Sequence, residues 1–180
     1  MNKLRIAVSQ FPVTKDIHNN EMYIKKHIIY AAEKNADVVH FPETALSGYE
    51  TDIALIDWAL IKESLNRIKR LAKKYNIYIV LGLHQKQTPN EKPYNSVCLI
   101  SKTGEILGWY SKKKLYGVEK NRFSINQNFF VGEINNIKCG FLICYDSCFP
   151  ELFQYYREHD VKVLFLSYYN ANNIQGKNSL

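Results

Sequence analysis

Three kinds of side chain that could share a nucleophilic reaction stand at the ends of strand-like segments in this sequence. Glu43 follows the apolar residues 38–41, a run of lysines follows residues 105–110, and Cys144 follows the apolar residues 141–143. A carboxylate can move protons, an ammonium can stabilise an oxyanion, and a thiolate can attack an electrophilic carbon. Because functional groups of α/β sheets gather at the carboxyl ends of strands, we expect the three to converge on one cavity.

Two of these features also have an ordinary structural interpretation. By its local pattern alone Glu43 is typical of a solvated loop acid, and the lysines at 112–114 are typical of surface charge. Alternate residues of a strand share a face, but this parity does not choose between Lys112 and Lys113 as the lysine at the edge of the core.

The cysteine stands at a predicted corner between a strand and a helix. Cys144 is followed by a turn at Asp146 and by Pro150, which suits the first turn of a helix. The positive end of that helix and a nearby lysine would lower the pKa of the thiol and favour the thiolate. The alternative is a buried core cysteine, as we interpret Cys98 and Cys139.

A Cys–His pair of the papain type is a rival arrangement. His40 and His84 lie near strand ends, so the histidines leave this alternative open. No stretch of the chain, however, resembles the sequence around a papain-type cysteine.

The elements that must position these residues alternate between strands and helices, which predicts a mixed α/β sheet with inserted hairpins. We expect strands over residues 4–10, 36–41, 77–83, 96–101, 105–110, 129–134, 137–145 and 161–167, and helices over 20–34, 61–75 and 150–159. Asn19 or Asn20 is expected to cap the first helix, and Gly82 to end the third strand.

Length and composition indicate a single globular domain over residues 1–180. Hydrophobic residues make up 46% of the chain and charged residues 23%. No apolar run approaches the roughly 18 residues of a membrane span, and we identify no signal peptide, so we expect a cytoplasmic protein without a membrane partner. The net charge of +7 could favour anionic partners, but the basic residues are scattered, and we expect no nucleic-acid binding.

The four cysteines predict neither a disulfide framework nor a metal site. Three lie in or beside apolar runs, where a reduced cysteine behaves as a small hydrophobe, and a reducing compartment disfavours disulfides. Cys144 and Cys148 are four residues apart, but no second pair and no nearby histidine completes a zinc site.

Three separated motifs give the sequence a strong resemblance to the nitrilase superfamily, the carbon–nitrogen hydrolases. FPETALSGYE at 41–50 resembles the glutamate motif of the family, YSKKKLYG at 110–117 its lysine motif, and GFLICYDSCFPE at 140–151 its cysteine motif. The motifs occur in the order found in the family, and the resemblance extends over residues 4–170.

The resemblance implies roles for individual residues. Glu43 is implied to be the catalytic base and acid, Lys112 the lysine that stabilises the oxyanion, and Cys144 the nucleophile. The alignment of Tyr110 and Leu115 with the lysine motif is what selects Lys112.

Three further residues are implied to contact the substrate. Glu119 resembles the second glutamate that many members place near the nucleophile, Tyr49 belongs to the glutamate motif, and Tyr145 follows the cysteine. The residues around the cysteine are more similar to the amidase and carbamoylase branches than to true nitrilases. The implied reaction is hydrolysis of a non-peptide amide or N-carbamoyl substrate through a thioester.

The family also implies a fold, an assembly and the absence of a cofactor. The expected fold is a four-layer α-β-β-α sandwich with mixed sheets, and family members commonly dimerise, so we expect a homo-oligomer. Members need neither a metal nor an organic cofactor, and we expect none.

The C-terminal residues depart from the family pattern. Residues 168–180 are polar, without periodicity, and cannot supply the helix and strand with which family domains continue. We therefore expect a domain that is incomplete at its C-terminus, as a truncated product, or completed by a second polypeptide or by self-association. The alternative to an active hydrolase is a weak or inactive remnant that acts at most as a binding or interaction protein.

Overall fold

The computed structural model describes residues 3–88 and 90–169, which form two β-sheets and four α-helices. The first sheet has the strand order β1 (Ile6–Val8), β2 (Val38–His40), β3 (Tyr78–Gln85), β4 (Tyr94–Ile100) and β5 (Ile106–Ser111). The second sheet has the order β6 (Gly132–Ile134), β7 (Ile137–Ile143) and β8 (Val163–Ser167). The helices are α1 (Ile17–Glu33), α2 (Trp58–Tyr75), α3 (Glu119–Arg122) and α4 (Pro150–Glu158), with 3-10 turns η1 (Ile53–Leu55) and η2 (Cys144–Cys148).

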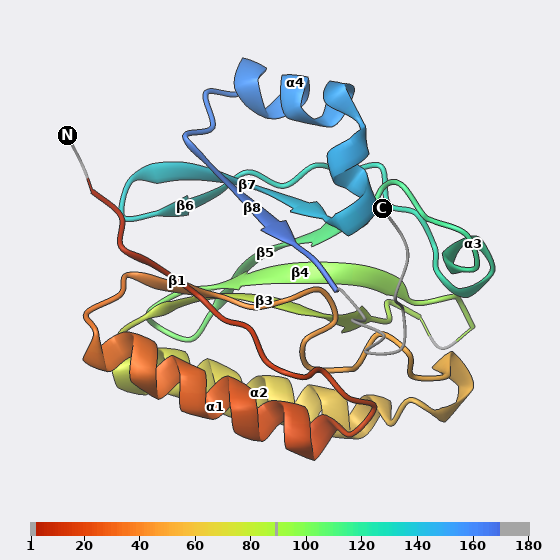
Figure 1. Ribbon diagram of the computed structural model, residues 1–180, viewed down its shortest axis with the longest axis horizontal. Coiled ribbons are helices and arrows are strands. Elements are labelled where there is room, and N and C mark those ends of the chain that lie inside the picture. Colours follow the sequence, from red (N-terminus) through yellow and green to blue (C-terminus); the bar gives the residue numbers. More distant parts are fainter. Residues whose placement is uncertain (1–2, 89, 170–180) are drawn as a thin grey trace, which may run out of the picture.

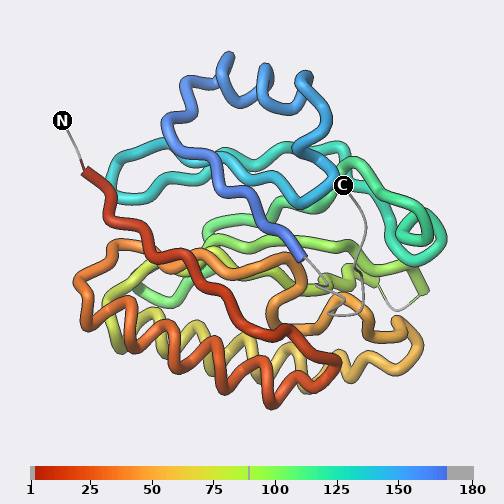
Figure 2. Tube along the Cα trace, in the orientation of Figure 1, coloured from red at the N-terminus to blue at the C-terminus, as the bar shows by residue number. Residues whose placement is uncertain are grey.

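The four layers follow the order of the chain. In Figure 1, α1 and α2 cover one face of the five-stranded sheet, the three-stranded sheet lies over its other face, and α4 covers the far side of that second sheet. The colours of Figure 2 show that the chain up to β5 builds the first two layers and that the later segments build the other two. The expected four-layer α-β-β-α sandwich is confirmed.

Both sheets are mixed, as the sequence predicts. The strands β1, β2 and β3 pair in parallel, whereas β3, β4 and β5 are antiparallel neighbours. In the second sheet β6 and β7 form a hairpin and β8 is parallel to β7. The hairpin turn at Asn135 and Asn136 has φ of 49° and 62°, the left-handed backbone that a two-residue turn of this kind requires.

The apolar side chains form two cores that share the strands β3 and β4. Ile79 and Leu81 pack toward α1 and α2, whereas Val80 and Leu99 pack toward the second sheet, where Phe141 meets them. Since both faces of these strands are buried, their sequences read as continuous apolar runs rather than as an alternation.

The starts of both long helices lie earlier than the sequence predicts. Asp16 caps α1 by accepting hydrogen bonds from two backbone N–H groups, and Asp57 caps α2 in the same way through Leu60 N. The expected cap at Asn19 or Asn20 is wrong, because Asn20 is buried inside the helix and its amide bonds the backbone oxygens of Thr14 and Leu46. Within the described ranges, no helix is both long and apolar enough to span a membrane.

Candidate active site

Glu43 is a buried residue at the carboxyl end of β2. Pro42 terminates the strand, and the chain then turns through Thr44, whose φ is 49°. Gly82 of β3 makes room for this turn, because a Cβ there would lie 2.2 Å from the carbonyl oxygen of Pro42 and 2.8 Å from the amide nitrogen of Thr44. The expected end of β3 at Gly82 is therefore wrong: the strand continues to Gln85, and the glycine serves the close approach of the turn.

Lys112 brings a buried ammonium between two carboxylates. The residue follows β5, and its side chain is only 1% exposed. Its Nζ donates to Glu43 Oε1 at 2.8 Å and to Glu119 Oε1 at 2.7 Å. The neighbouring Lys113 is also buried, but its Nζ bonds the backbone oxygens of residues 126 and 128.

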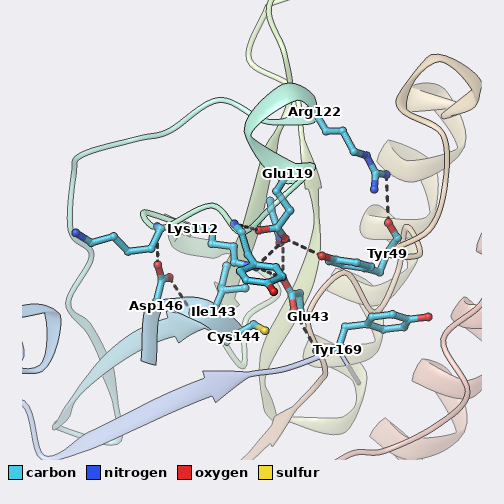
Figure 3. A network of polar contacts seen from close by, with 12 residues as sticks. Glu43, Tyr49, Lys112, Glu119, Arg122, Ile143, Cys144, Asp146 and Tyr169 are labelled. Carbon is cyan, nitrogen blue, oxygen red and sulfur yellow. Dashed lines mark hydrogen bonds and ion pairs between the residues drawn. The ribbon is translucent and has the colours of Figure 1, made fainter. Parts of the chain in front are cut away.

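Glu119 lies at the start of the short helix α3 and gathers three donors. Besides the ammonium of Lys112, its Oε1 accepts from the hydroxyl of Tyr49 at 3.0 Å, and its Oε2 accepts from the backbone nitrogen of Tyr116 at 2.7 Å. Figure 3 shows Glu43, Lys112, Glu119 and Tyr49 joined in this network.

Cys144 occupies a tight corner between β7 and the turn η2. Its φ is 46°, a left-handed conformation that is uncommon for a residue with a side chain, and its side chain is partly exposed. Figure 3 shows the thiol beside Glu43. The charges that act on the thiol are those of Glu43, Lys112 and Glu119.

Asp146 holds this corner against the end of β5. Its carboxylate is fully buried and accepts hydrogen bonds from Ile143 N, the Tyr110 hydroxyl, Lys113 N and Lys114 N, at 2.8–3.1 Å. The first of these donors belongs to the second sheet and the others to the segment around Lys112. One carboxylate thus fixes the corner that carries Cys144 relative to the segment that carries Lys112.

The cluster of Glu43, Lys112 and Glu119 has an excess of negative charge when all three are ionised, because one ammonium pairs with two buried carboxylates. Burial acts to lower the pKa of Lys112, but Glu43 and Glu119 more than offset it, so the pKa lies above its ordinary value. Burial raises the pKa of Glu43 above 4.5, although Lys112 and a hydrogen bond from Asn95 act in the opposite direction. The lysine therefore keeps its proton while Glu43 gains affinity for one, as a group that both takes and returns a proton requires.

The pKa of the Cys144 thiol is raised, whereas the sequence analysis expected it to be lowered. Burial raises the pKa of Cys144 to about 11, Glu43 adds to this shift, and Lys112 only partly opposes it. The expectation that a helix and a lysine lower this pKa is wrong, because desolvation and the carboxylate outweigh them. At neutral pH the Cys144 thiol is therefore mostly protonated, and a thiolate forms only if a base takes its proton.

Tyr145 and the two histidines near strand ends have other neighbours. The ring of Tyr145 packs edge-on against Tyr116 and Phe149, and its contact with a substrate stays a prediction. His40 Nε2 lies 2.8 Å from the Ser167 hydroxyl. The ring of His84 stacks on Phe123.

Burial lowers the pKa of His40 to about 4 and that of His84 to about 3, so both are neutral at pH 7. Neither contributes to the charge around the thiol of Cys144, which argues against the papain-type alternative. In the part of the chain that the structure describes, no group of three His, Cys, Asp or Glu side chains could hold a metal ion.

Two residues that bind Glu43 escaped the sequence analysis. Asn95 in β4 donates from Nδ2 to Glu43 Oε1 at 2.7 Å, and Tyr169, just after β8, donates from its backbone nitrogen to Oε2 at 3.0 Å. An asparagine in a strand and a main-chain N–H carry no local signal of such a role. The closeness of Asn95 and of the end of β8 to Glu43 could have been inferred only from the fold.

The fold and comparison with known proteins define the class of this protein. A model of the carbon–nitrogen hydrolase family matches residues 5–179, and the chain belongs to this family. The expected membership of the nitrilase superfamily is confirmed.

Individual relatives include nitrilases and amidases. The chain is 30% identical over 157 residues to a probable nitrilase of Schizosaccharomyces pombe. The aligned region covers 83% of this chain and 58% of the relative. The chain is 28% identical over 169 residues to 2-oxoglutaramate amidase of Bacillus subtilis. Here the aligned region covers 91% of this chain and 62% of that enzyme. The chain thus spans about three fifths of the length of these curated relatives.

Solved structures agree with the fold. An amidase from Nesterenkonia sp. superposes with a TM-score of 0.88 at 24% identity, over 96% of this chain and 69% of that one. At this identity the likeness shows the fold alone.

Proposed function

We propose that this chain hydrolyses the carbon–nitrogen bond of a non-peptide amide or N-carbamoyl compound, with Cys144 as nucleophile, Glu43 as general base and acid, and Lys112 as oxyanion-stabilising group. The observation that carries the proposal is the buried ammonium of Lys112, 2.8 Å from Glu43 and adjacent to the corner of Cys144. A fixed cation in a water-poor site stabilises a developing negative charge much more than a cation in water does.

The first half of the reaction forms a thioester. Glu43 takes the proton of the Cys144 thiol as the sulfur forms a bond to the substrate carbonyl carbon, and the carbonyl π electrons move onto oxygen beside Lys112. The carbonyl then re-forms as the C–N bond breaks, and Glu43 returns the proton to the leaving nitrogen. The leaving group departs as ammonia or an amine.

The second half regenerates the enzyme. Glu43 takes a proton from water as the water oxygen attacks the thioester carbon, and Lys112 again faces the oxyanion. The C–S bond breaks, the acid product forms, and Glu43 protonates the thiolate of Cys144. Glu119 keeps Lys112 in place through the 2.7 Å bond to its Nζ, and with Tyr49 borders the space in which we place the substrate.

Related proteins support this assignment. The curated relatives include enzymes named 2-oxoglutaramate amidase, deaminated glutathione amidase and omega-amidase. A glutamate-to-glutamine variant of the Nesterenkonia amidase carries the product of Michael addition of acrylamide at its active-site cysteine. A cysteine-to-alanine variant of that amidase was solved in complex with butyramide.

Ammonia release and trapping of the thioester test the proposal. The purified chain is mixed with a small library of amides and N-carbamoyl compounds, and intact-protein and peptide mass spectrometry search for an acyl group on Cys144. We expect the Cys144→Ala variant to release no ammonia and the matched Cys148→Ala variant, which changes an exposed thiol, to behave as the parent. Substrate binding without turnover in the parent would instead support an inactive binding protein.

The organisation of the chain belongs to the same proposal. We place residues 1–180 in one domain, since both sheets share the core between them, and we propose that the chain self-associates and acts in the cytoplasm. Light scattering after size-exclusion chromatography measures the oligomeric state, and fluorescence microscopy of a tagged chain measures its location.

A further inference from the structure

The carboxylate of Glu43 is held by three donors that come from three different elements. Its Oε1 accepts from Asn95 Nδ2 of β4 at 2.7 Å and from Lys112 Nζ, after β5, at 2.8 Å. Its Oε2 accepts from the backbone nitrogen of Tyr169, after β8, at 3.0 Å. The two oxygens of the carboxylate are therefore in different environments.

The peptide group between Tyr168 and Tyr169, just after β8, bonds both the backbone and the side chain of Glu43. The backbone nitrogen of Glu43 donates to the carbonyl oxygen of Tyr168 at 3.2 Å, and the next N–H along the chain, that of Tyr169, donates to the Glu43 side chain. These two bonds close a ring that fixes the carboxylate relative to the end of β8.

A stacked pair of rings anchors the same segment. The rings of Tyr169 and Tyr49 are stacked at 4.7 Å with an interplanar angle of 17°, and the Tyr49 hydroxyl bonds Glu119. Figure 3 shows Tyr49 and Tyr169 together on one side of Glu43. The end of β8 is thus connected with both carboxylates of the cluster.

Counting acceptor positions separates the two oxygens of Glu43. Each carboxylate oxygen has about two lone-pair directions. Among donors from the described residues, Oε1 accepts two, which occupy both of its positions, whereas Oε2 accepts one, which leaves its second position open. A proton that leaves the thiol or a water molecule can be received only at an open position.

We propose that Oε2 of Glu43 is the oxygen that takes and returns the catalytic proton, and that the backbone N–H of Tyr169 is the group that positions it. This inference rests on the proposed function. In the first step the S–H bond of Cys144 breaks, its electron pair forms the S–C bond, and the proton forms an O–H bond at Oε2. When the C–N bond breaks, the same proton moves from Oε2 to the nitrogen.

We also expect the N–H of Tyr169 to lower the proton affinity of this oxygen. A hydrogen bond donated to a carboxylate favours its ionised form and lowers its pKa. The bond thus opposes the effect of burial on Glu43, which raises the pKa. Without it, Glu43 would stay protonated to a higher pH.

Replacement of the Tyr169 amide by an ester tests the inference, because it removes one N–H and keeps the ring. Incorporation of the α-hydroxy acid analogue of tyrosine at position 169 makes this change. We expect kcat to fall about tenfold or more, and the acidic limb of the pH profile of kcat/KM to move up by about one unit. The Tyr169→Phe variant is the matched control: it keeps both the N–H and the stacked ring, loses only the hydroxyl, and should show the same acidic limb as the parent.

Several outcomes would overturn the inference. An ester variant with the kcat and acidic limb of the parent would show that the N–H does not position the base. A Tyr169→Phe variant that shows the same shift of the limb would assign the role to the side chain instead. If the Glu43→Gln and Cys144→Ala variants released ammonia like the parent, the proposed function itself would fail, which the ester variant alone does not decide.

Neutron diffraction supplies a second measurement that needs no variant. Crystals of the parent at a pH below the acidic limb should show deuterium on Oε2 of Glu43. Deuterium on Oε1 would overturn the inference even if the ester variant does not fold.

Discussion

The ammonium of Lys112 and the carboxylate of Glu43 lie 2.8 Å apart although 69 positions separate them in the chain, and both side chains are almost completely buried. Glu119 shares the same ammonium at 2.7 Å. An ion pair of this kind is costly to desolvate and gives weak evidence for stability. Its presence at the ends of two strands, beside a partly exposed thiol, instead points to a chemical role.

Removal of the ammonium should impair both folding and turnover. Lys112→Met leaves Glu43 and Glu119 buried with no counter-charge, and we expect the free energy of unfolding to fall by about 3–5 kcal/mol. We expect kcat of the folded fraction to fall by about 10²–10³, because the oxyanion loses its donor. Urea unfolding and steady-state kinetics measure the two effects.

Lys113→Met is the control for that substitution. It removes a second buried lysine, whose Nζ donates hydrogen bonds to two backbone oxygens and, among the described residues, to no carboxylate. We expect a loss of stability without a comparable loss of turnover per folded molecule. Equal loss of kcat in both variants would contradict the role assigned to Lys112.

The rate should depend on the ionisation of Glu43. Burial raises its pKa above 4.5, and the base must be deprotonated to receive the thiol proton. The kcat/KM should therefore rise with pH through a limb whose midpoint lies above 4.5. A midpoint at or below 4.5 would contradict this assignment.

The same shift has the opposite effect on stability. A carboxyl whose pKa is raised in the folded state binds its proton more tightly there, so its contribution favours folding at low pH. That contribution is lost as the pH rises through the raised pKa. Compared with the parent, the Glu43→Gln variant should gain relative stability as the pH increases from 4 to 8, which thermal unfolding at several pH values measures.

Glu43→Gln should abolish turnover and yet make the thiol more reactive. The negative charge of Glu43 is one cause that raises the pKa of Cys144 to about 11. Without it, the thiolate fraction and the rate of alkylation by iodoacetamide at pH 8 should increase, up to about tenfold for each unit of pKa. Peptide mass spectrometry follows the labelling, and the exposed Cys148 serves as internal control. Slower labelling of Cys144 in this variant would mean that Glu43 acts as a base in the alkylation too.

Asp146 should be required for the corner that presents the thiol. Asp146→Ala leaves four donors without their acceptor, among them Ile143 N and the Tyr110 hydroxyl. Each buried donor that stays unpaired costs about 1–3 kcal/mol, so we expect a loss of at least about 3 kcal/mol in the free energy of unfolding. Tyr110→Phe removes only one donor and should cost about 1 kcal/mol. Similar losses in the two variants would argue against this role of the carboxylate.

Local sequence patterns predicted the existence and order of the strands and of the three longer helices, but not the short helix α3. The hairpin at Asn135–Asn136 and the buried strand before Cys144 were both expected from residues within a few positions of each other. The starts of the helices were less accurate, because Asp16 and Asn20 are both possible caps and only the packing of Asn20 against residue 46 decides between them. The expected end of the third strand at Gly82 was wrong, because this glycine lies within β3 and makes space for the turn at residues 42–44.

The sequence by itself determined the fold class and the three residue types at the strand ends, since periodicity and motifs are encoded within short stretches. The lysine motif already selected Lys112 over Lys113, where strand parity could not, but only the tertiary structure decided that the Nζ of Lys112 lies between Glu43 and Glu119. It also decided which atoms hold Glu43: these bonds join residues 52, 69 and 126 positions apart. Contacts over such distances arise from the stacking and pairing of strands, which no local pattern specifies.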